Sequence, residues 1–342
     1  MKRLVFMAVM VAFILGTVGM AQAVEIKAQG DWQMSVNYIK NPNLDKDLDD
    51  DPFQAVQRFR TIFEFIANEN LKGVVRFNTN TLRSGANAGR GSLDIGTRND
   101  VWDLDVAHLD FMIPNTQVNV KAGLQPVALP NTLGAHILDD NVWAFTASSQ
   151  FNDMLGLTVG WARLADFKAG GVDTTGDGLI DSKNKDEVDM FMAIVPVTMD
   201  GFQINPFMAY ARLGKNALND DVDADGDPDY TDGNYETSNL FHAGINFTVD
   251  MFDPIKIMGD FNYGSMSKYY DDGANRTDVG ATAGWIADLA VAYQMDMMTP
   301  MIFGLYESGE SSSSFREDKK GKIMPNVLSP ANAGISSFGF GR

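Results

Sequence analysis

Cysteine is absent from this chain of 342 residues. The sequence therefore holds no disulfide framework, and a small secreted fold stapled by disulfides is excluded. Basic residues are also few, with 27 lysines and arginines against 45 aspartates and glutamates, which gives a formal net charge of -18. A nucleic-acid partner is not expected for a chain this acidic.

Long apolar runs are missing from the interior, where nothing approaches the roughly 20 consecutive apolar residues of a transmembrane helix. One shorter run, from Leu4 to Leu15, follows Lys2-Arg3 and precedes the small-residue site Ala21-Gln22-Ala23. This order is typical of a secretory signal peptide and predicts one over residues 1–23, with export of a mature chain that starts near Val24. Residues 1–23 contain two basic residues and no acid, so their removal changes the charge from -18 to -20.

Histidine is scarce, and this limits the catalytic chemistry that the chain can offer. The sequence has three histidines, His108, His136 and His242. None stands beside a serine or aspartate in an arrangement that indicates a nucleophile, and no zinc-like spacing of histidines and acids is present. Glycines are scattered through the chain, so no phosphate-binding loop is expected. The sequence predicts a protein that is not an enzyme and requires no cofactor.

What the chain does contain is a repeated pattern of period two, clearest in the segment 56–80. There an apolar set alternates with a polar one, and a short polar turn, Asn68-Glu69-Asn70, joins two such runs. Successive side chains of a strand point to opposite faces, so this pattern predicts two antiparallel strands with one oily and one wet face. In the first run Phe59, Thr61, Phe63 and Phe65 alternate with Arg58, Arg60, Ile62 and Glu64, and in the second Gly73, Val75 and Phe77 alternate with Lys72, Val74, Arg76 and Asn78.

Connections between the expected strands alternate between short and long. Short ones are expected at 68–70, 114–116, 152–154, 199–201, 252–253 and 295–299. Long polar ones are expected at 41–55, 81–101, 125–141, 165–186, 214–236, 265–280 and from 308 onward. Outer-membrane barrels have short periplasmic turns and longer extracellular loops, whereas a soluble sandwich has no reason to separate its connections by length.

The fold class that we predict is all-β, a transmembrane antiparallel β-barrel, with a large soluble β-sandwich or β-solenoid as the alternative. Apolar positions alternate through the later strands as well, and aromatic residues stand near strand ends, where membrane interfaces place them. The apolar faces are Val118, Val120, Ala122 and Leu124; Phe241, Ala243, Ile245, Phe247 and Val249; and Trp285, Ala287, Leu289, Val291 and Tyr293. The aromatic residues near strand ends are Trp32, Tyr38, Trp102, Trp143, Trp161, Tyr210 and Tyr263.

Three stretches resemble a known family. They are the run HLDFMIPNTQVNVKAGLQPVALPNTLGAHILDDNVWAFTASSQFNDMLGLTVGWARLAD over 108–166, the earlier run RFRTIFEFIANENLKGVVRF, and SFGFG near the end. Together they resemble the outer-membrane homotrimeric porins of sulfate-reducing bacteria. The resemblance implies a trimer of water-filled general diffusion barrels with about sixteen strands each, in the outer membrane of a Gram-negative cell.

The strand count departs from that family. Thirteen strands can be identified, an odd number, and no final amphipathic strand follows Gly339-Phe340-Gly341-Arg342. Bacterial single-chain barrels have an even number of strands, and hydrocarbon does not tolerate unpaired strand edges. We therefore expect a porin domain over 24–342 that lacks its closing strands at the C-terminus.

Charged residues in the inward phase are the candidates for the pore lining. Arg58, Arg60, Lys72, Arg76 and Lys121 are expected to form a basic ladder, with Glu64, His108 and Asp110 on the same wall. The resemblance implies that the third long loop, 125–141, folds inward, which makes Asp139 and Asp140 acidic partners facing the arginines. A transverse field of this kind orients polar solutes. The alternative is that the charges only solvate a wet wall.

Two acidic segments have the spacing of calcium loops. Alternate carboxylates on a tightly turning chain with glycine at the sixth position wrap around one Ca²⁺ ion. The candidate ligands are Asp221, Asp223, Asp225, Asp229 and Asp232 in one segment, with Gly226, and Asp173, Thr175, Asp177 and Asp181 in the other, with Gly178. The alternative is an acidic, solvated loop, which is also the preferred interpretation of the cluster at 45–51, where no such glycine is present.

The function that we predict from these patterns is passive diffusion of small hydrophilic solutes and ions through a porin. The expected partners are a second and third copy of the chain, outer-membrane lipid and lipopolysaccharide, and the solutes themselves. Met190, Met192 and Ile194 are expected on the outward surface that contacts another copy. A substrate-selective channel, for anions or another solute class, is the main alternative, and a secreted calcium-binding β-sandwich adhesion module is a third.

Overall fold

All regular structure in the described residues is β-strand. The computed structural model describes residues 24–38, 53–79, 82–84, 102–134, 136–165, 187–214, 237–267, 281–309 and 322–325. Within them, no helix is long and apolar enough to cross a membrane. The predicted all-β class built from antiparallel strands is confirmed, while the predicted signal peptide at 1–23 lies outside the described residues.

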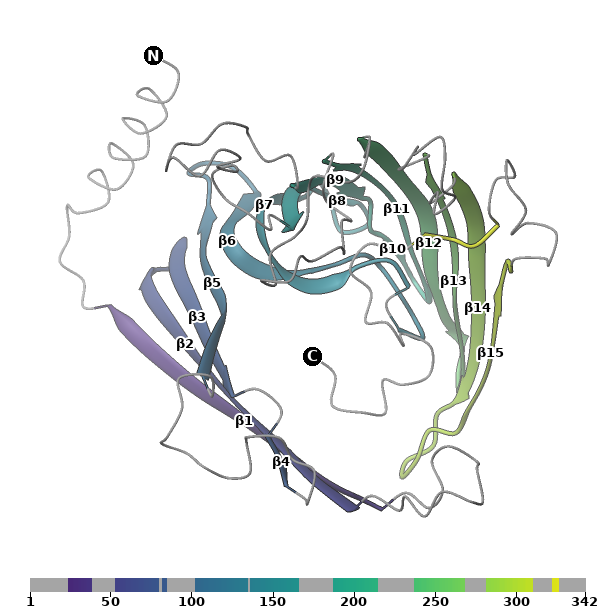
Figure 1. The fold of residues 1–342 in the computed structure, drawn as a ribbon, viewed down its shortest axis with the longest axis horizontal. Coiled ribbons are helices and arrows are strands. Elements are labelled where there is room, and N and C mark those ends of the chain that lie inside the picture. Colours follow the sequence, from purple (N-terminus) through teal and green to yellow (C-terminus); the bar gives the residue numbers. More distant parts are fainter. Residues whose placement is uncertain are drawn as a thin grey trace, which may run out of the picture. The chain divides into compact units, whose positions relative to one another are not determined.

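The chain divides into two compact units, Met1–Phe111 and Met112–Arg342. In the first unit, four long strands pair antiparallel with their neighbours in chain order (Figure 1). They are β1 (Glu25–Tyr38), β2 (Phe53–Asn68), β3 (Leu71–Thr79) and β5 (Trp102–Met112), and the short strand β4 (Leu82–Ser84) pairs with β2. The unit is therefore a simple meander, as the alternating segment 56–80 predicts.

In the second unit, nine long strands form another antiparallel meander (Figure 1). They are β6 (Val118–Ala128), β7 (Asp139–Gln150), β8 (Gly156–Ala165), β9 (Val188–Ile194), β11 (Phe202–Leu213), β12 (Ser238–Phe252), β13 (Ile255–Met266), β14 (Thr282–Tyr293) and β15 (Met301–Glu307). The short β10 (Val197–Met199) pairs with β11. Among the described residues, thirteen strands are seven residues long or more, the number that the sequence predicts.

The strand bounds confirm the predicted short turns. Strands end and restart around 69–70, 113–117, 151–155, 200–201, 253–254 and 294–300. At Gly201 the backbone φ is 67°, and an added Cβ would lie 2.5 Å from the Cβ of Met251, so this turn requires glycine. Several predicted long connections are wrong in their bounds. Residues 53–55, 82–84 and 265–266 belong to β2, β4 and β13. Gln125–Ala128 and Asp139–Asn141 also pair as strand, so only 129–138 connects β6 to β7.

The sheet of the second unit has two distinct faces. One, here called the aromatic face, exposes Trp143, Phe191 and Phe261 at 54, 57 and 50%. The other, the covered face, carries a buried apolar cluster that includes Ala144, Met190 and Phe207. The register confirms the predicted phases of β12 and β14. Across β13, Ala243, Ile245 and Phe247 lie level with Trp285, Ala287 and Leu289, in that order.

The expectation that Met190 and Met192 lie on an outward contact surface is wrong. Met190 is fully buried and Met192 is nearly so, both within the apolar cluster of the covered face. Phe191, between them, takes the exposed position because neighbouring strand residues point to opposite faces. Ile194 is partly buried and packs against the same cluster.

Candidate functional site

The polar side chains of the first unit gather on one face of its sheet, here called the charged face. Register places them level with one another: Gln33 pairs with Arg58, Asp31 with Arg60, and Lys72 with Asp110. Every predicted pore-lining residue of this unit belongs to the charged face. They are Arg58, Arg60, Glu64, Lys72, Arg76, His108 and Asp110.

Several of these charges are held in place by partners. Arg76 donates from Nε and Nη2 to the two carboxylate oxygens of Asp105 at 2.9 and 3.0 Å, a bidentate pair that is mostly shielded from solvent. Arg76 pairs with Val106 and Phe77 pairs with Leu104, so Asp105 is the extra residue of a β-bulge in β5 next to Arg76. Lys72 lies 3.7 Å from Glu64 and 3.8 Å from Asp110, and these more exposed contacts contribute little to stability.

The opposite face of the first unit is apolar and exposed. Trp32 and Met34 each expose 69% of their surface, and Leu104 and Leu109 expose 50%. Trp32 pairs with Phe59, and Phe77 with Leu104, so these side chains form one continuous surface. Apolar and charged side chains thus lie on opposite faces of this sheet, as their alternation in the sequence predicts.

In the second unit, four polar residues stand side by side across four strands of the covered face. Asn205 of β11 pairs with Asn246 of β12, Asn246 with Asp260 of β13, and Asp260 with Asp288 of β14. Asn205 Nδ2 donates to Asn246 Oδ1 at 2.9 Å, and Asn246 Nδ2 donates to Asp260 Oδ1 at 2.8 Å. The backbone N–H of Asp260 donates to Asp288 Oδ1 at 3.1 Å. We call these four residues the polar row.

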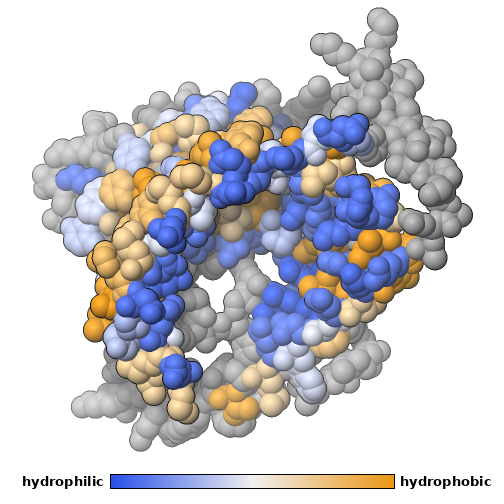
Figure 2. Space-filling view, turned by 180° about the vertical axis from the view of Figure 1, so that it is seen from behind, coloured by the Kyte–Doolittle hydropathy of each residue, from blue (hydrophilic) through white to orange (hydrophobic). Residues whose placement is uncertain are grey.

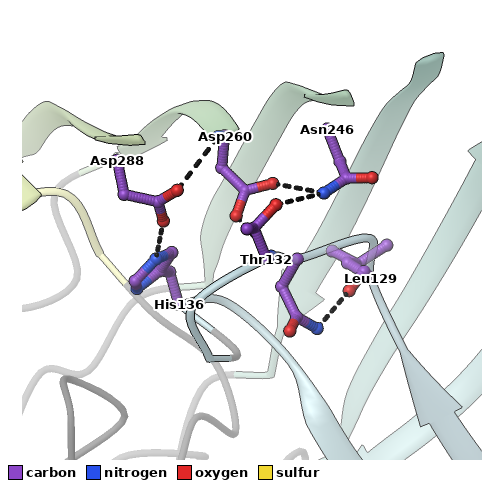
Figure 3. A network of polar contacts seen from close by, with 7 residues as sticks. Leu129, Thr132, His136, Asn246, Asp260 and Asp288 are labelled. Carbon is purple, nitrogen blue, oxygen red and sulfur yellow. Dashed lines mark hydrogen bonds and ion pairs between the residues drawn. The ribbon is translucent and has the colours of Figure 1, made fainter. Parts of the chain in front are cut away.

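The connection 129–138 between β6 and β7 reaches this polar row (Figure 3). The backbone N–H of Thr132 donates to Asp260 Oδ2, and Asn246 Nδ2 donates to Thr132 Oγ1 at 2.6 Å. His136 Nε2 lies 2.8 Å from Asp288 Oδ2. The connection is therefore fixed to three strands that follow it by more than a hundred residues.

Apolar contacts hold the same connection at its ends. Leu129, Ile137 and Leu138 are buried within the apolar cluster of the covered face. The backbone N–H of Leu129 donates to the carbonyl of Leu138 at 3.1 Å, which closes the hairpin above the cluster. Thus the connection is anchored by apolar burial at its base and by carboxylates at its tip.

A second segment, 322–325, also lies on the covered face. His242 Nε2 lies 2.6 Å from the carbonyl oxygen of Pro325, and Thr282 donates to the carbonyl of Ile323 at 2.6 Å. A Cβ on Gly284 would lie 2.4 Å from the Lys322 carbonyl oxygen, so glycine permits the close approach. Chain segments therefore lie on the covered face of this sheet, and none of the described residues lies over its aromatic face.

The remaining predicted site residues fall in three places. Lys121 lies on β6, level with Thr146 of β7. Asp139 and Asp140 are the first two residues of β7, so they point to opposite faces of the sheet, and their relation to the arginines stays a prediction. The candidate calcium ligands Asp173, Thr175, Asp177, Asp181, Asp221, Asp223, Asp225, Asp229 and Asp232 lie outside the described residues.

The sequence patterns missed the polar row and the residues that meet it. His136 and Asp288 are 152 positions apart, so no local spacing connects them. The available signal was the pair of acids at polar positions of two successive strands, Asp260 and Asp288. Alternation shows that each faces away from the aromatic side, but only the register shows that they are adjacent.

Comparison with known proteins finds no matching family model and no matching curated protein. Solved structures with a similar chain path do exist. One is "Salmonella typhi OmpF complex with Daunomycin", at 12% identity and TM-score 0.45 over 85% of this chain and 80% of that one. Another is "High pH structure of Pseudomonas putida OprB", at 13% identity and TM-score 0.39 over 79% of this chain and 74% of that one. A third is the loop L8 deletion mutant of OmpT, described as an outer membrane protein of Vibrio cholerae. It has 14% identity and TM-score 0.39 over 84% of this chain and 94% of that one. At such identities the likeness concerns the chain path alone.

Proposed function

We propose that this protein is an outer-membrane porin, a transmembrane antiparallel β-barrel with a water-filled channel for small hydrophilic solutes and ions. The observation that carries the proposal is an exposed apolar face in each unit, opposite the charged face in the first unit and opposite the covered face, with its polar row, in the second. Trp32 and Met34 represent it in the first unit, and Trp143, Phe191 and Phe261 in the second. Figure 2 shows hydrophobic and hydrophilic residues gathered in separate patches.

The size of the aromatic face supports a lipid environment over a watery one. Exposed large apolar side chains of this face stand on eight successive long strands, from Trp143 of β7 to Tyr306 of β15, and along β14 they run from Trp285 to Val291. At about 4.8 Å between strands and about 3.4 Å per residue, they cover roughly 34 by 20 Å, about 700 Å². The largest apolar patch on a typical soluble monomer covers about 300–600 Å². A soluble β-sandwich would have buried this surface in its core.

Strand length agrees with a membrane crossing. The strands β7, β11, β13 and β14 each contain 12 residues. A strand of that length spans about 40 Å and, when tilted by about 45°, crosses about 28 Å, close to the hydrocarbon thickness of a bilayer. Isolated strands cannot satisfy their backbone groups in lipid, so the proposal includes a closed barrel.

A substrate-selective channel is the second candidate, and the charged face of the first unit favours it. Arg58, Arg60 and Arg76 share that face, although the whole chain has a formal charge of -18. Asp105 offsets the charge of Arg76, so Arg58 and Arg60 carry the preference. Guanidinium groups on a channel wall would favour anions, because the field of a wall acts on ions that pass close to it. We propose a general diffusion pore with anion preference as the form to test first.

Assembly, location and loop chemistry complete the proposal. The sequence resemblance to homotrimeric porins of sulfate-reducing bacteria supports a homotrimer in the Gram-negative outer membrane, in contact with lipid and lipopolysaccharide. The spacing of acids at 173–181 and 221–232 supports Ca²⁺ binding by those segments. Light scattering in detergent should give a protein mass near three chains, and calorimetric titration of chelator-treated protein should show Ca²⁺ binding that is lost in Asp225→Asn.

Liposome swelling tests the diffusion function. Liposomes that contain the purified protein are placed in isotonic solutions of sugars of increasing size. The proposal predicts fast swelling with a monosaccharide and progressively slower swelling with larger sugars, because a water-filled pore discriminates by size. Swelling no faster than in protein-free liposomes, from protein that is soluble without detergent, would support a secreted β-sandwich instead.

A further inference from the structure

His136, Asp260 and Asp288 form a compact group of potential metal ligands. One atom from each, an imidazole nitrogen or a carboxylate oxygen, lies within 4.8 Å of the other two, and all three residues are buried. They come from the connection 129–138, from β13 and from β14. It is the single group of this kind among the residues that the structure describes.

The two carboxylates of this group have a single cationic partner among the described residues. Asp260 and Asp288 stand directly opposite each other on neighbouring strands, where two like charges destabilise a sheet. They are 2 and 6% exposed, and buried charges require a partner. Within the described residues neither carboxylate pairs with lysine or arginine, and His136 is the one ionisable cation in contact, at 2.8 Å from Asp288.

The neighbouring hydrogen bonds do not neutralise the two carboxylates. Thr132, Asn246 and the Asp260 amide are neutral donors, so they orient the two carboxylates without neutralising them. Asn262 lies two residues beyond Asp260 on the same face of β13. Its Oδ1 atom is buried and has no hydrogen-bond partner among the described residues.

We propose that His136, Asp260 and Asp288 bind a divalent transition-metal ion of the Zn²⁺ class. One imidazole nitrogen with two carboxylate oxygens suits Zn²⁺, whose three-ligand sites keep one position for water, while Ca²⁺ and Mg²⁺ prefer oxygen alone. Two carboxylates and a neutral imidazole carry two negative charges, which one such ion neutralises. Tetrahedral ligands about 2.0 Å from zinc stand about 3.3 Å apart, so His136 and Asp288 need to separate only slightly from 2.8 Å.

The bound ion would connect the tip of 129–138 to β13 and β14 at the point where Thr132 already meets Asp260. Binding itself does not depend on the proposed function. If the chain is a porin, the ion would hold the β6–β7 connection in one position, and that consequence rests on the proposed function.

Zinc titration of the full-length protein in detergent, after treatment with EDTA, tests the proposal. Bound Zn²⁺ is measured by competition with a chromophoric chelator, with Mn²⁺ and Ca²⁺ as comparison ions. We expect the wild type to bind one more Zn²⁺ ion per chain tightly than His136→Gln or Asp288→Asn does. The zinc affinity at this site should fall by about 100-fold or more in each variant. His108→Gln, a histidine change in the first unit, serves as the matched control and should still bind this ion.

Equal zinc stoichiometry and affinity in the wild type and in folded His136→Gln would overturn the proposal and assign the zinc to other acidic segments. X-ray absorption of the zinc-loaded wild type provides a readout that needs no variant. Imidazole nitrogen together with oxygen in the first coordination sphere supports the site, while a sphere of oxygen alone overturns it. Neither measurement involves conductance, so a failed metal site and a failed porin function remain distinguishable.

Discussion

Asp260 should control whether the connection 129–138 stays attached to the sheet. Its carboxylate accepts from the backbone N–H of Thr132 and from Asn246 Nδ2. The Asn246 bond lies within the sheet, so the bond from Thr132 is the one that holds the connection, and a hydrogen bond to a charged group contributes about 1.5–3 kcal/mol of docking free energy. Since every 1.4 kcal/mol is a factor of ten, Asp260→Ala should raise the detached population by about 10-fold to 100-fold.

Hydrogen exchange read by mass spectrometry measures this detachment. In Asp260→Ala, peptides over 129–138 should lose about 10-fold or more of their protection, while peptides from β7 keep theirs. Asp260→Asn, which retains one acceptor oxygen but turns an amide donor toward its neighbours, should give a smaller loss. The control Asp250→Ala removes an exposed carboxylate at the far end of β12 and should change nothing. Unchanged protection in Asp260→Ala would refute the reasoning and leave the apolar contacts as the sole anchor.

Three further substitutions test other parts of the account. Phe261→Arg, at a half-exposed position of the aromatic face, should lower the free energy of unfolding in bilayers by about 2–4 kcal/mol. If that face met water instead, the loss would be about 0.5 kcal/mol or less. Thr248→Arg on the covered face is the control, and equal effects of the two substitutions would contradict a lipid-facing surface. Arg60→Gln should reduce the anion-to-cation permeability ratio by roughly five-fold. A unit charge about 8 Å away in water contributes about 0.5 kcal/mol with opposite sign to an anion and a cation, so their difference changes by about 1 kcal/mol. The reversal potential in a salt gradient measures the ratio, and no shift would remove Arg60 from the channel wall. Met190→Ala should cost about 2–5 kcal/mol in urea unfolding because the side chain is fully buried, and a loss below about 1 kcal/mol would argue against that packing.

Strand positions and most strand faces were predictable from the sequence because they depend on local chemistry. Alternation along 241–249 and 285–293 identifies the faces of β12 and β14, and the register agrees. Polar pairs and triplets such as Glu69-Asn70 identify the short turns. The same local rule fails in β9, whose sequence VDMFMAI is apolar at both phases, so periodicity alone could not show that Met190 is covered and Phe191 exposed.

The polar row could not be predicted because it depends on pairing between distant strands. Asp260 and Asp288 are each unremarkable as single polar residues of a strand. They become a site only because β13 and β14 pair in the register that sets them opposite each other, and because 129–138 brings Thr132 and His136 to them. The charged face of the first unit was easier to predict, since a short turn joins β2 to β3 and both strands alternate clearly.

Planar-bilayer conductance of the purified full-length protein is the most direct test of the central claim, that the apolar faces meet lipid around a water-filled channel. We predict stepwise openings in groups of three, with conductance proportional to salt concentration and a reversal potential that indicates anion preference. No conductance, from protein that remains soluble and monodisperse without detergent, would contradict the claim.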